Sequence, residues 1–204
     1  DNTQTFQHKE KNGLISTSNT GREEINFKNI EFSRIFMAWN IPSLKNQRIN
    51  IGFEILASIL SVGRNSRLIK SLKEEKNIVQ SIYVEVNAGE LGGLLIIEAC
   101  CDNKNLKNVE KQINEEIQEV ISFKNLTLNE LRKAINIVKS NYIFNLETST
   151  QLTSFLGNEL LWGRKNSIRE LDNHLKYWSS LKNFNEIINY LSREKFTLIA
   201  SKDK

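Results

Sequence analysis

Apolar residues in this chain recur with two different spacings, and the order of the spacings restricts the fold. Every second residue is apolar in segments near residues 25, 39, 84 and 198. Elsewhere, long segments carry an apolar residue every three or four positions, which is the period of a helix. The predicted order is two strands, two helices, a β-hairpin, several helices and a closing strand. That order is typical of an α+β two-layer sandwich, in which a mostly antiparallel sheet carries helices on one face.

The second strand is predicted to lie in the centre of the sheet because nearly all of its residues are apolar. Pro42 ends it, since proline has no N–H to donate to a neighbouring strand. The large residues of this strand alternate along the chain: Ile35, Met37, Trp39 and Ile41.

A β-hairpin is predicted over residues 79–101. Val79–Val86 alternates between apolar and polar residues, and Asn87–Gly92 supplies a glycine-rich turn. Gly93–Cys101 is a continuous apolar run, which predicts a fully buried strand.

Helices are predicted on both sides of the hairpin. Asn46–Leu60 carries one apolar face, and a shorter helix is expected over Ser66–Lys76. Three later segments have the spacing of helix starts: Thr127–Glu130, Ser167–Glu170 and Asn183–Glu186.

The composition excludes several classes of protein. The 204 residues, with 39% hydrophobic and 25% charged side chains, are ordinary for one globular domain. No apolar stretch approaches the length of a transmembrane helix, so no membrane span is predicted. The net charge of +4 is spread along the chain without a basic stripe, which argues against nucleic-acid binding.

Histidine and cysteine are too few for a zinc site in this chain. The two histidines, His8 and His174, lie far apart, and the two cysteines, Cys100 and Cys101, are adjacent. The usual ligand spacings cannot be made from them. No G-x-S-x-G, Walker A or G-x-G-x-x-G motif is present either. The sequence therefore predicts no catalytic residue, metal ligand or cofactor in this chain and argues against a self-contained hydrolase.

The polar start of the chain predicts an arm or linker over residues 1–21, followed by one domain over residues 22–204. The chain begins at Asp1 without methionine and without a signal peptide, so we expect a piece or a processed form of a longer protein. The adjacent cysteines and the missing signal peptide favour a cytoplasmic location, with an extracytoplasmic one as the alternative.

An ordered series of segments is more specific than its periodicity alone. The series consists of Arg34–Pro42, the helix Asn46–Leu60, the turn Gly63–Leu68, Leu72–Glu75, the hairpin and the helix Thr127–Lys139. It resembles the C-terminal-type, non-zinc-binding domain of the insulinase/pitrilysin family, which includes the processing peptidases. The resemblance covers roughly residues 20–200 and implies the same α+β fold.

Members of that family are inverted zinc peptidases, whose N-terminal half holds zinc through an H-x-x-E-H motif. This chain lacks the motif, since His8 is followed by Lys9-Glu10-Lys11. The resemblance therefore implies that the chain is the other half, which encloses unfolded peptide beside a zinc site. It also implies three kinds of partner: a zinc-binding N-terminal half in the same or a partner chain, a peptide substrate, and a second subunit in a homo- or heterodimer.

The resemblance also implies a substrate-contact pair. Peptidase members place an arginine and a tyrosine seven residues apart, where they help to stabilise charge on the attacked carbonyl. The matching positions here are Lys73 and Gln80. Lysine keeps the charge without the planar fork of arginine, and glutamine keeps a donor without the phenol. Tyr83 is expected on the opposite strand face. The simpler interpretation is an exposed helix lysine and an edge-strand glutamine.

The turn after the first helix is a second candidate site. Gly63, Arg64, Ser66 and Arg67 resemble a short form of the glycine-rich loop that guides peptides in processing peptidases. Its arginines would then bind acidic or C-terminal groups of a peptide. With a single glycine, an ordinary turn with surface charges is the alternative.

Other chemically active residues have structural interpretations. Cys100 and Cys101 are expected to be buried thiols rather than a redox or metal pair, because neighbours on a strand point to opposite faces. His174 has no visible partner and is expected on a helix surface, exposed or half-buried. Core and interface packing, rather than a peptide-stacking surface, is expected for the tryptophans: Trp39, Trp162 and Trp178.

The leading hypothesis is thus the non-zinc-binding half of an insulinase-family metallopeptidase, inactive when isolated. The alternative is a catalytically inactive relative that serves as a structural or partner subunit, which the altered pair favours. A third hypothesis, an anion- or nucleic-acid-binding module, is suggested only by the isoelectric point near 9.0.

Overall fold

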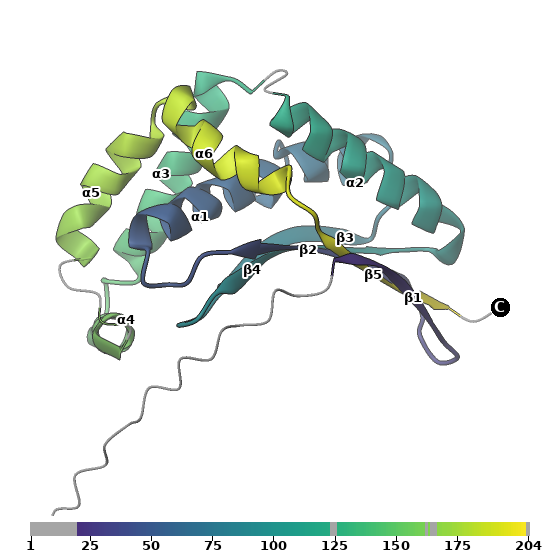
Figure 1. The fold of residues 1–204 in the computed structure, drawn as a ribbon, viewed down its shortest axis with the longest axis horizontal. Coiled ribbons are helices and arrows are strands. Elements are labelled where there is room, and N and C mark those ends of the chain that lie inside the picture. Colours follow the sequence, from purple (N-terminus) through teal and green to yellow (C-terminus); the bar gives the residue numbers. More distant parts are fainter. Residues whose placement is uncertain (1–19, 123–125, 162, 164–166, 203–204) are drawn as a thin grey trace, which may run out of the picture.

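The computed structural model describes residues 20–122, 126–161, 163 and 167–202, and these form two layers. A five-stranded sheet makes one layer, and helices cover one of its faces (Figure 1). The α+β sandwich expected from the sequence is confirmed. Most of the arm predicted over residues 1–21 lies outside the described residues, and Gly21 already belongs to the first strand.

The sheet has the order β1-β5-β2-β4-β3, so β2 is central as expected. β1 pairs with β5 in parallel, and the pairs β5–β2, β2–β4 and β4–β3 are antiparallel. The hairpin predicted over residues 79–101 is the β3–β4 pair. The strands are β1 (Gly21–Phe27), β2 (Ser33–Ile41), β3 (Ser81–Ala88), β4 (Gly93–Cys101) and β5 (Phe196–Lys202).

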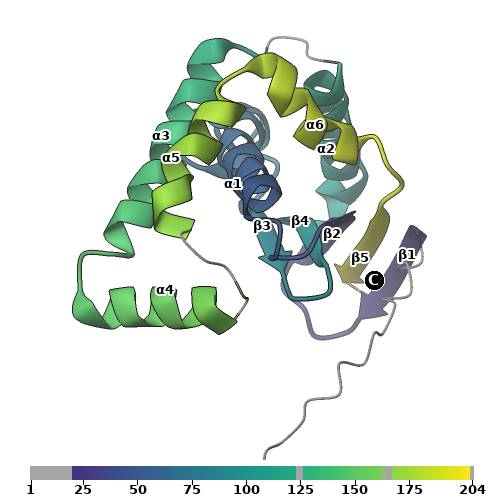
Figure 2. The ribbon, with the colours of Figure 1, turned by 60° about the vertical axis from the view of Figure 1, so that its left-hand side comes forward.

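The helix layer is built around α1, which has α3 and α5 on one side and α6 and α2 on the other (Figure 2). A π-helical segment, Ile69–Glu75, and a short 3₁₀ turn, Asn103–Asn105, join this layer to the sheet. The α-helices are α1 (Gln47–Ser61), α2 (Leu106–Ile121), α3 (Leu128–Phe144), α4 (Ser149–Leu161), α5 (Ser167–Trp178) and α6 (Leu181–Leu191).

The hydrophobic core lies between the sheet and the helices. β2 turns alternate residues inward, and these are fully or almost fully buried. The indole of Trp39 donates to the carbonyl of Leu191 at 3.2 Å, and the indole of Trp178 donates to that of Arg48 at 2.7 Å. Each buried tryptophan thus satisfies its polar atom while filling the core. Core packing is confirmed for these two, and Trp162 lies outside the described residues.

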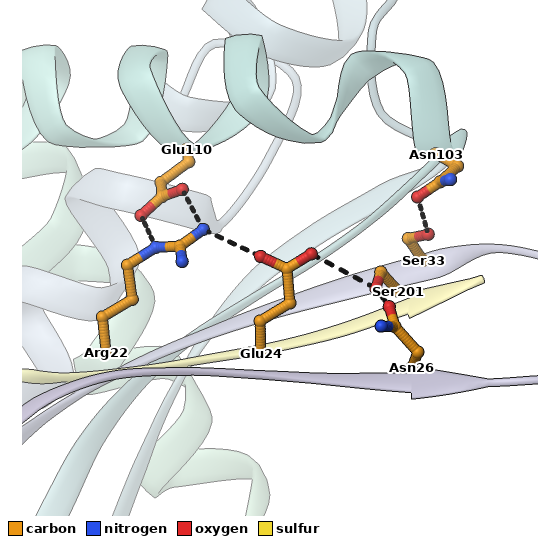
Figure 3. A network of polar contacts seen from close by, with 7 residues as sticks. All are labelled: Arg22, Glu24, Asn26, Ser33, Asn103, Glu110 and Ser201. Atoms are coloured by element: carbon orange, nitrogen blue, oxygen red, sulfur yellow. Dashed lines mark hydrogen bonds and ion pairs between the residues drawn. The ribbon is translucent and has the colours of Figure 1, made fainter. Parts of the chain in front are cut away.

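β1 is held by polar contacts rather than by burial, since all seven of its residues are exposed. Arg22 donates two hydrogen bonds to Glu110 of α2, at 3.1 and 3.3 Å, and a third to Glu24 at 3.3 Å. Ser201 of β5 contacts both Glu24 and Asn26 (Figure 3). The network raises the pKa of Arg22, chiefly through its hydrogen bond to Glu110. It joins the edge of the sheet to the helix layer.

Several predicted boundaries differ from the structure. β3 begins at Ser81 rather than Val79, and the helix expected over Ser66–Lys76 is largely π-helical. α6 begins at Leu181 rather than Asn183, whose amide donates to the carbonyl of Tyr177 at 2.8 Å instead of capping the helix. By contrast, the capping box at Thr127–Glu130 is present at the start of α3.

Candidate functional site

The turn after α1 is a compact connection between two helices. Gly63 has φ +85°, a left-handed conformation that favours glycine. Ser66 closes the turn, because both its backbone N–H and its hydroxyl donate to the carbonyl of Gly63, at 3.0 and 2.7 Å. The Ser66 hydroxyl is therefore committed within the turn.

Arg67 links this turn to α3. Its guanidinium donates to both carboxylate oxygens of Glu130, at 2.9 and 3.1 Å, and its side chain is only 10% exposed. Glu130 also closes the capping box, accepting from the backbone N–H of Thr127 at 3.0 Å. Burial opposes the charged form of Glu130, but the hydrogen bonds from Arg67 and Thr127 together hold its pKa below the usual range. Arg67 thus has a structural role in joining the turn to α3, and whether it also contacts a peptide stays a prediction.

Arg64 is the exposed cation of the turn. Its guanidinium contacts Glu74 at 2.6 and 3.2 Å, and the hydrogen bond from Arg64 lowers the pKa of that carboxyl. Glu74 adjoins Lys73, whose positive charge acts on the same carboxylate. The structure therefore brings the turn and Lys73 together around Glu74.

Lys73 lies within the π-helical segment, and Gln80 immediately precedes β3. Both side chains are exposed. The backbone N–H of Gln80 donates to the carbonyl of Cys100 at 2.8 Å, which anchors Gln80 beside β4. The connection between the two residues is also tied to α2, because Lys76 contacts Gln112. Whether Lys73 and Gln80 contact a substrate stays a prediction.

The face of the sheet away from the helix layer is open. In the part of the chain that the structure describes, no helix lies over it (Figure 1). The strand register places seven half-buried apolar side chains there. They are Phe36, Ala38, Leu94, Ile96, Phe196, Leu198 and Ala200.

A polar cluster crosses the same open face. Glu98 of β4 accepts from both Arg34 of β2 and the phenol of Tyr83 on β3. The hydrogen bond to Glu98, assisted by burial and by the carboxylate charge, raises the pKa of Tyr83. The hydrogen bond to Glu98 also raises the pKa of Arg34. Three strands thus present an arginine and a tyrosine fixed by one carboxylate. Sequence reasoning missed this cluster, because it depends on the register between strands that are distant in sequence.

The two thiols are poor nucleophiles. Cys100 and Cys101 are both free and buried, in keeping with the interpretation as structural thiols. Burial raises the pKa of Cys101 to about 12 and also raises that of Cys100. Thiolates are the reactive forms, so burial disfavours reaction at both cysteines.

His174 lies on α5 and is half-buried, at the edge of a pocket of about 540 Å³ that also includes Asn46 and Arg48. Its Nε2 is 3.7 Å from a carboxylate oxygen of Glu170, and burial lowers its pKa. A single carboxylate at that distance does not make His174 a catalytic base.

The described residues do not fit a zinc ion. Over residues 20–122, 126–161, 163 and 167–202, no group of three or more His, Cys, Asp or Glu side chains is placed to hold a metal. His8 lies outside these ranges. None of the described helices is both long and apolar enough to cross a membrane.

Curated relatives match part of the chain. It is 28% identical over 147 residues to an uncharacterized zinc protease, YmxG, of Bacillus subtilis strain 168. This match covers 70% of the chain but only 34% of the relative, so the chain spans about a third of that protein's length. A second uncharacterized zinc protease, SCO5738 of Streptomyces coelicolor, is 25% identical over 118 residues, which cover 57% of the chain and 26% of that protein.

Solved structures share the fold. A protease from Helicobacter pylori superposes with a TM-score of 0.74 at 15% identity, covering 90% of this chain and 44% of that one. A peptidase M16 inactive domain from Pseudomonas fluorescens also gives 0.74, at 13% identity, covering 90% and 43%. At these identities the likeness concerns the fold.

The family assignment comes from the sequence match. The family described as "Peptidase M16 inactive domain" matches residues 3–138, which is two thirds of the chain. The match includes the central strand, the turn after α1, the hairpin and most of α3. The resemblance drawn from the sequence is confirmed, and the chain belongs to the peptidase M16 family as an inactive domain.

Proposed function

We propose that this domain is the non-catalytic half of a zinc peptidase and that its open face forms one wall of a chamber for unfolded peptide. The observation that carries the proposal is the open face itself, where seven apolar side chains are half-buried and no helix among the described residues covers them. An unfolded peptide exposes apolar side chains, and covering them on this surface is favourable. The names of the two curated relatives, both called zinc proteases, also support a role in a zinc peptidase.

The residues of this chain indicate which part of the catalytic machinery it would contribute. Because its described residues do not fit zinc, the metal and the general base are assigned to another half, in the same or a partner chain. The domain contributes surface and enclosure, which exclude water and orient the peptide. Arg34 adds guanidinium donors for the peptide backbone, and the phenol oxygen of Tyr83 can accept a hydrogen bond, since its own O–H donates to Glu98.

A scaffold role is the second candidate. It is favoured by Lys73 and Gln80, which stand where the peptidases that this chain resembles have an arginine and a tyrosine. Both side chains are exposed and neither reproduces a planar fork or a phenol. In that case the whole protein would bind a partner without cleaving peptides.

The deciding experiment uses the complete protein that contains this domain. We expect about one zinc per zinc-binding half by metal analysis and chelator-sensitive cleavage of a quenched unfolded peptide. Ile96→Lys on the open face should lower kcat/KM by about tenfold with the zinc content unchanged. Leu128→Lys, on an exposed apolar residue of α3, is the matched control and should leave kcat/KM unchanged.

Two results would overturn parts of the proposal. A protein with neither zinc nor cleavage is a scaffold relative. A zinc-dependent peptidase in which Ile96→Lys behaves like the control does not use the open face as a chamber wall. The isolated domain should not cleave the peptide, with or without added zinc.

A further inference from the structure

The last turns of α1, the turn that follows it and α3 together line a pocket of about 230 Å³. The pocket belongs to the helix layer, and the open face lies on the other side of the sheet (Figure 1). A volume of 230 Å³ corresponds to about eight water molecules, which is the size of one short organic acid or one amino-acid residue. The pocket is therefore separate from the chamber wall proposed above.

The walls of the pocket are largely apolar. Ile59 and Ala134 are buried, and Ile137 is half-buried. Val62 also lines the pocket and is 45% exposed. Apolar groups of a ligand that leave water for these walls contribute favourably to binding. The walls therefore favour a ligand with an apolar body.

A buried hydroxyl lies in the lining as well. Ser58 is 5% exposed, and its hydroxyl has no hydrogen-bond partner among the described residues. Ser61, on the same helix, differs from it, because the Ser61 hydroxyl donates to Ala57 and accepts from Val84. A buried polar group without a partner costs free energy, and a ligand atom that accepts from Ser58 removes that cost.

The charges around the pocket leave one cation without a partner. Glu130 lines the pocket, but both of its carboxylate oxygens accept from Arg67. Arg64 is paired with Glu74. Lys133 is exposed and forms no ion pair within the described part of the chain. Two neutral pairs and one lysine favour a ligand with a single negative charge.

We propose that this pocket binds a monocarboxylate with a short apolar body. The ammonium of Lys133 pairs with the carboxylate, the hydroxyl of Ser58 donates to it, and the apolar walls cover the body. A phosphate dianion fits less well, because one lysine does not balance its charge and the walls offer it no donors. The same chemistry has two sources: a free short-chain acid, and the C-terminal residue of a peptide that ends in an apolar residue.

The first test is an NMR titration of the complete protein with 4-methylpentanoate. We expect saturable binding that Lys133→Gln weakens about tenfold. Arg132→Gln is the matched control, since Arg132 is the neighbouring exposed cation of α3 and does not line the pocket. The proposal is overturned if the wild type shows no saturable binding, or if the two variants bind equally well.

A second pair of variants tests the location. Val62→Glu adds a carboxylate to the exposed part of the lining and should weaken binding of 4-methylpentanoate at least tenfold by repulsion. Leu128→Glu, at a 47% exposed leucine of α3 outside the lining, should bind like the wild type. Equal affinities of these two variants would place the ligand elsewhere and overturn the proposal.

Ser58→Ala separates binding from folding. It removes a hydroxyl that has no partner in the free protein, so the urea midpoint should stay or rise. Binding of 4-methylpentanoate should weaken about fivefold, because the carboxylate loses a donor. A lower midpoint with unchanged binding is the result expected of a purely structural serine, and it would contradict the proposed role.

Competition distinguishes the two sources. A short peptide that ends in leucine displaces 4-methylpentanoate if the source is a peptide terminus, and its C-terminal amide does not. Failure of both peptides, with 4-methylpentanoate still bound, identifies a free acid. Equal displacement by acid and amide overturns the proposal. Ile96→Lys on the open face and removal of zinc should leave binding unchanged, so this pocket and the peptidase proposal can fail separately.

Discussion

Arg67 and Glu130, 63 residues apart, join two helices through paired hydrogen bonds of 2.9 and 3.1 Å. The same carboxylate caps the start of α3, so one side chain fixes both the turn after α1 and the beginning of the next long helix. The resemblance suggested a peptide-reading arginine at this position. In the structure its guanidinium forms an ion pair with Glu130, and contact with a peptide stays a prediction.

Removal of that ion pair should destabilise the domain. Arg67→Ala leaves the Glu130 carboxylate without its charged donors, and we expect a loss of about 1–3 kcal/mol in the free energy of unfolding. Urea unfolding of the wild type and the variant measures the difference. Arg64→Ala is the matched control: its ion pair with Glu74 lies in solvent, and the urea midpoint should not move. Equal effects of the two variants would contradict the structural role of Arg67.

The stabilisation by Glu130 should depend on pH. Its pKa is lower in the folded protein than in the unfolded chain, so its contribution is fully present above the unfolded pKa of about 4.5. The contribution is lost as the pH falls through the folded pKa. We expect the difference in unfolding free energy between wild type and Glu130→Gln to be constant near neutral pH and to shrink below about pH 4.5. A difference that persists unchanged at lower pH would show that charge is not the cause.

Ser61 ties α1 to the edge strand β3. Its hydroxyl accepts from the backbone N–H of Val84 at 2.8 Å and donates to the carbonyl of Ala57 at 3.3 Å. Ser61→Ala leaves the Val84 N–H without this partner, and we expect a loss of about 1–3 kcal/mol in thermal or urea unfolding. Ser192→Ala, on an exposed serine that bonds only its own helix end, should change stability by less than about 0.5 kcal/mol. Faster amide exchange at Val84 would locate the effect.

Gly52 lets α1 approach the helices above it. A Cβ at this position would lie 2.6 Å from Cδ1 and Cγ1 of Ile187 and 3.0 Å from the indole of Trp178. Both neighbours are fully buried, so Gly52→Ala should cost about 1–3 kcal/mol. Adding Ile187→Val, which removes Cδ1, should recover part of that loss, so the two changes should not be additive.

A second glycine provides the control for Gly52. A Cβ at Gly157 of α4 meets nothing within 4 Å, and Gly157→Ala should raise helix stability by up to about 1 kcal/mol. Destabilisation by both alanines would point to a general effect of glycine replacement rather than to the contact with Ile187.

The elements of the fold could be predicted where the pattern is local. The nearly all-apolar composition of the second strand was enough to place β2 at the centre, and the glycine-rich turn was enough to predict the β3–β4 hairpin. The capping box at Thr127 marked the start of α3 for the same reason, since its atoms belong to four consecutive residues. The start of α6 was misplaced because Asn183 has a suitable side chain but uses it on Tyr177.

Features that depend on distant residues could not be predicted. The cluster of Arg34, Tyr83 and Glu98 exists only because three strands pair in one register. Ile69–Glu75 is short and buries only Ser71 and Leu72, so apolar periodicity in the sequence does not distinguish a π-helix from an α-helix here. The position of α4 outside the helix layer could not be predicted either. An amphipathic pattern does not show whether the apolar face of a helix packs against the core of its own domain.

Because β1 pairs with β5, the last strand of the chain, β1 cannot join the sheet until almost the whole domain has been synthesised. Asn26 and Ser201, which meet across these strands, are 175 residues apart. At usual elongation rates the nascent chain spends roughly 10 to 35 s between the two. During that time β1 has no strand to join, and β2 has a neighbour on one side only. The newly made chain therefore carries an unpaired strand edge until β5 emerges, and such an edge can pair with other chains and aggregate.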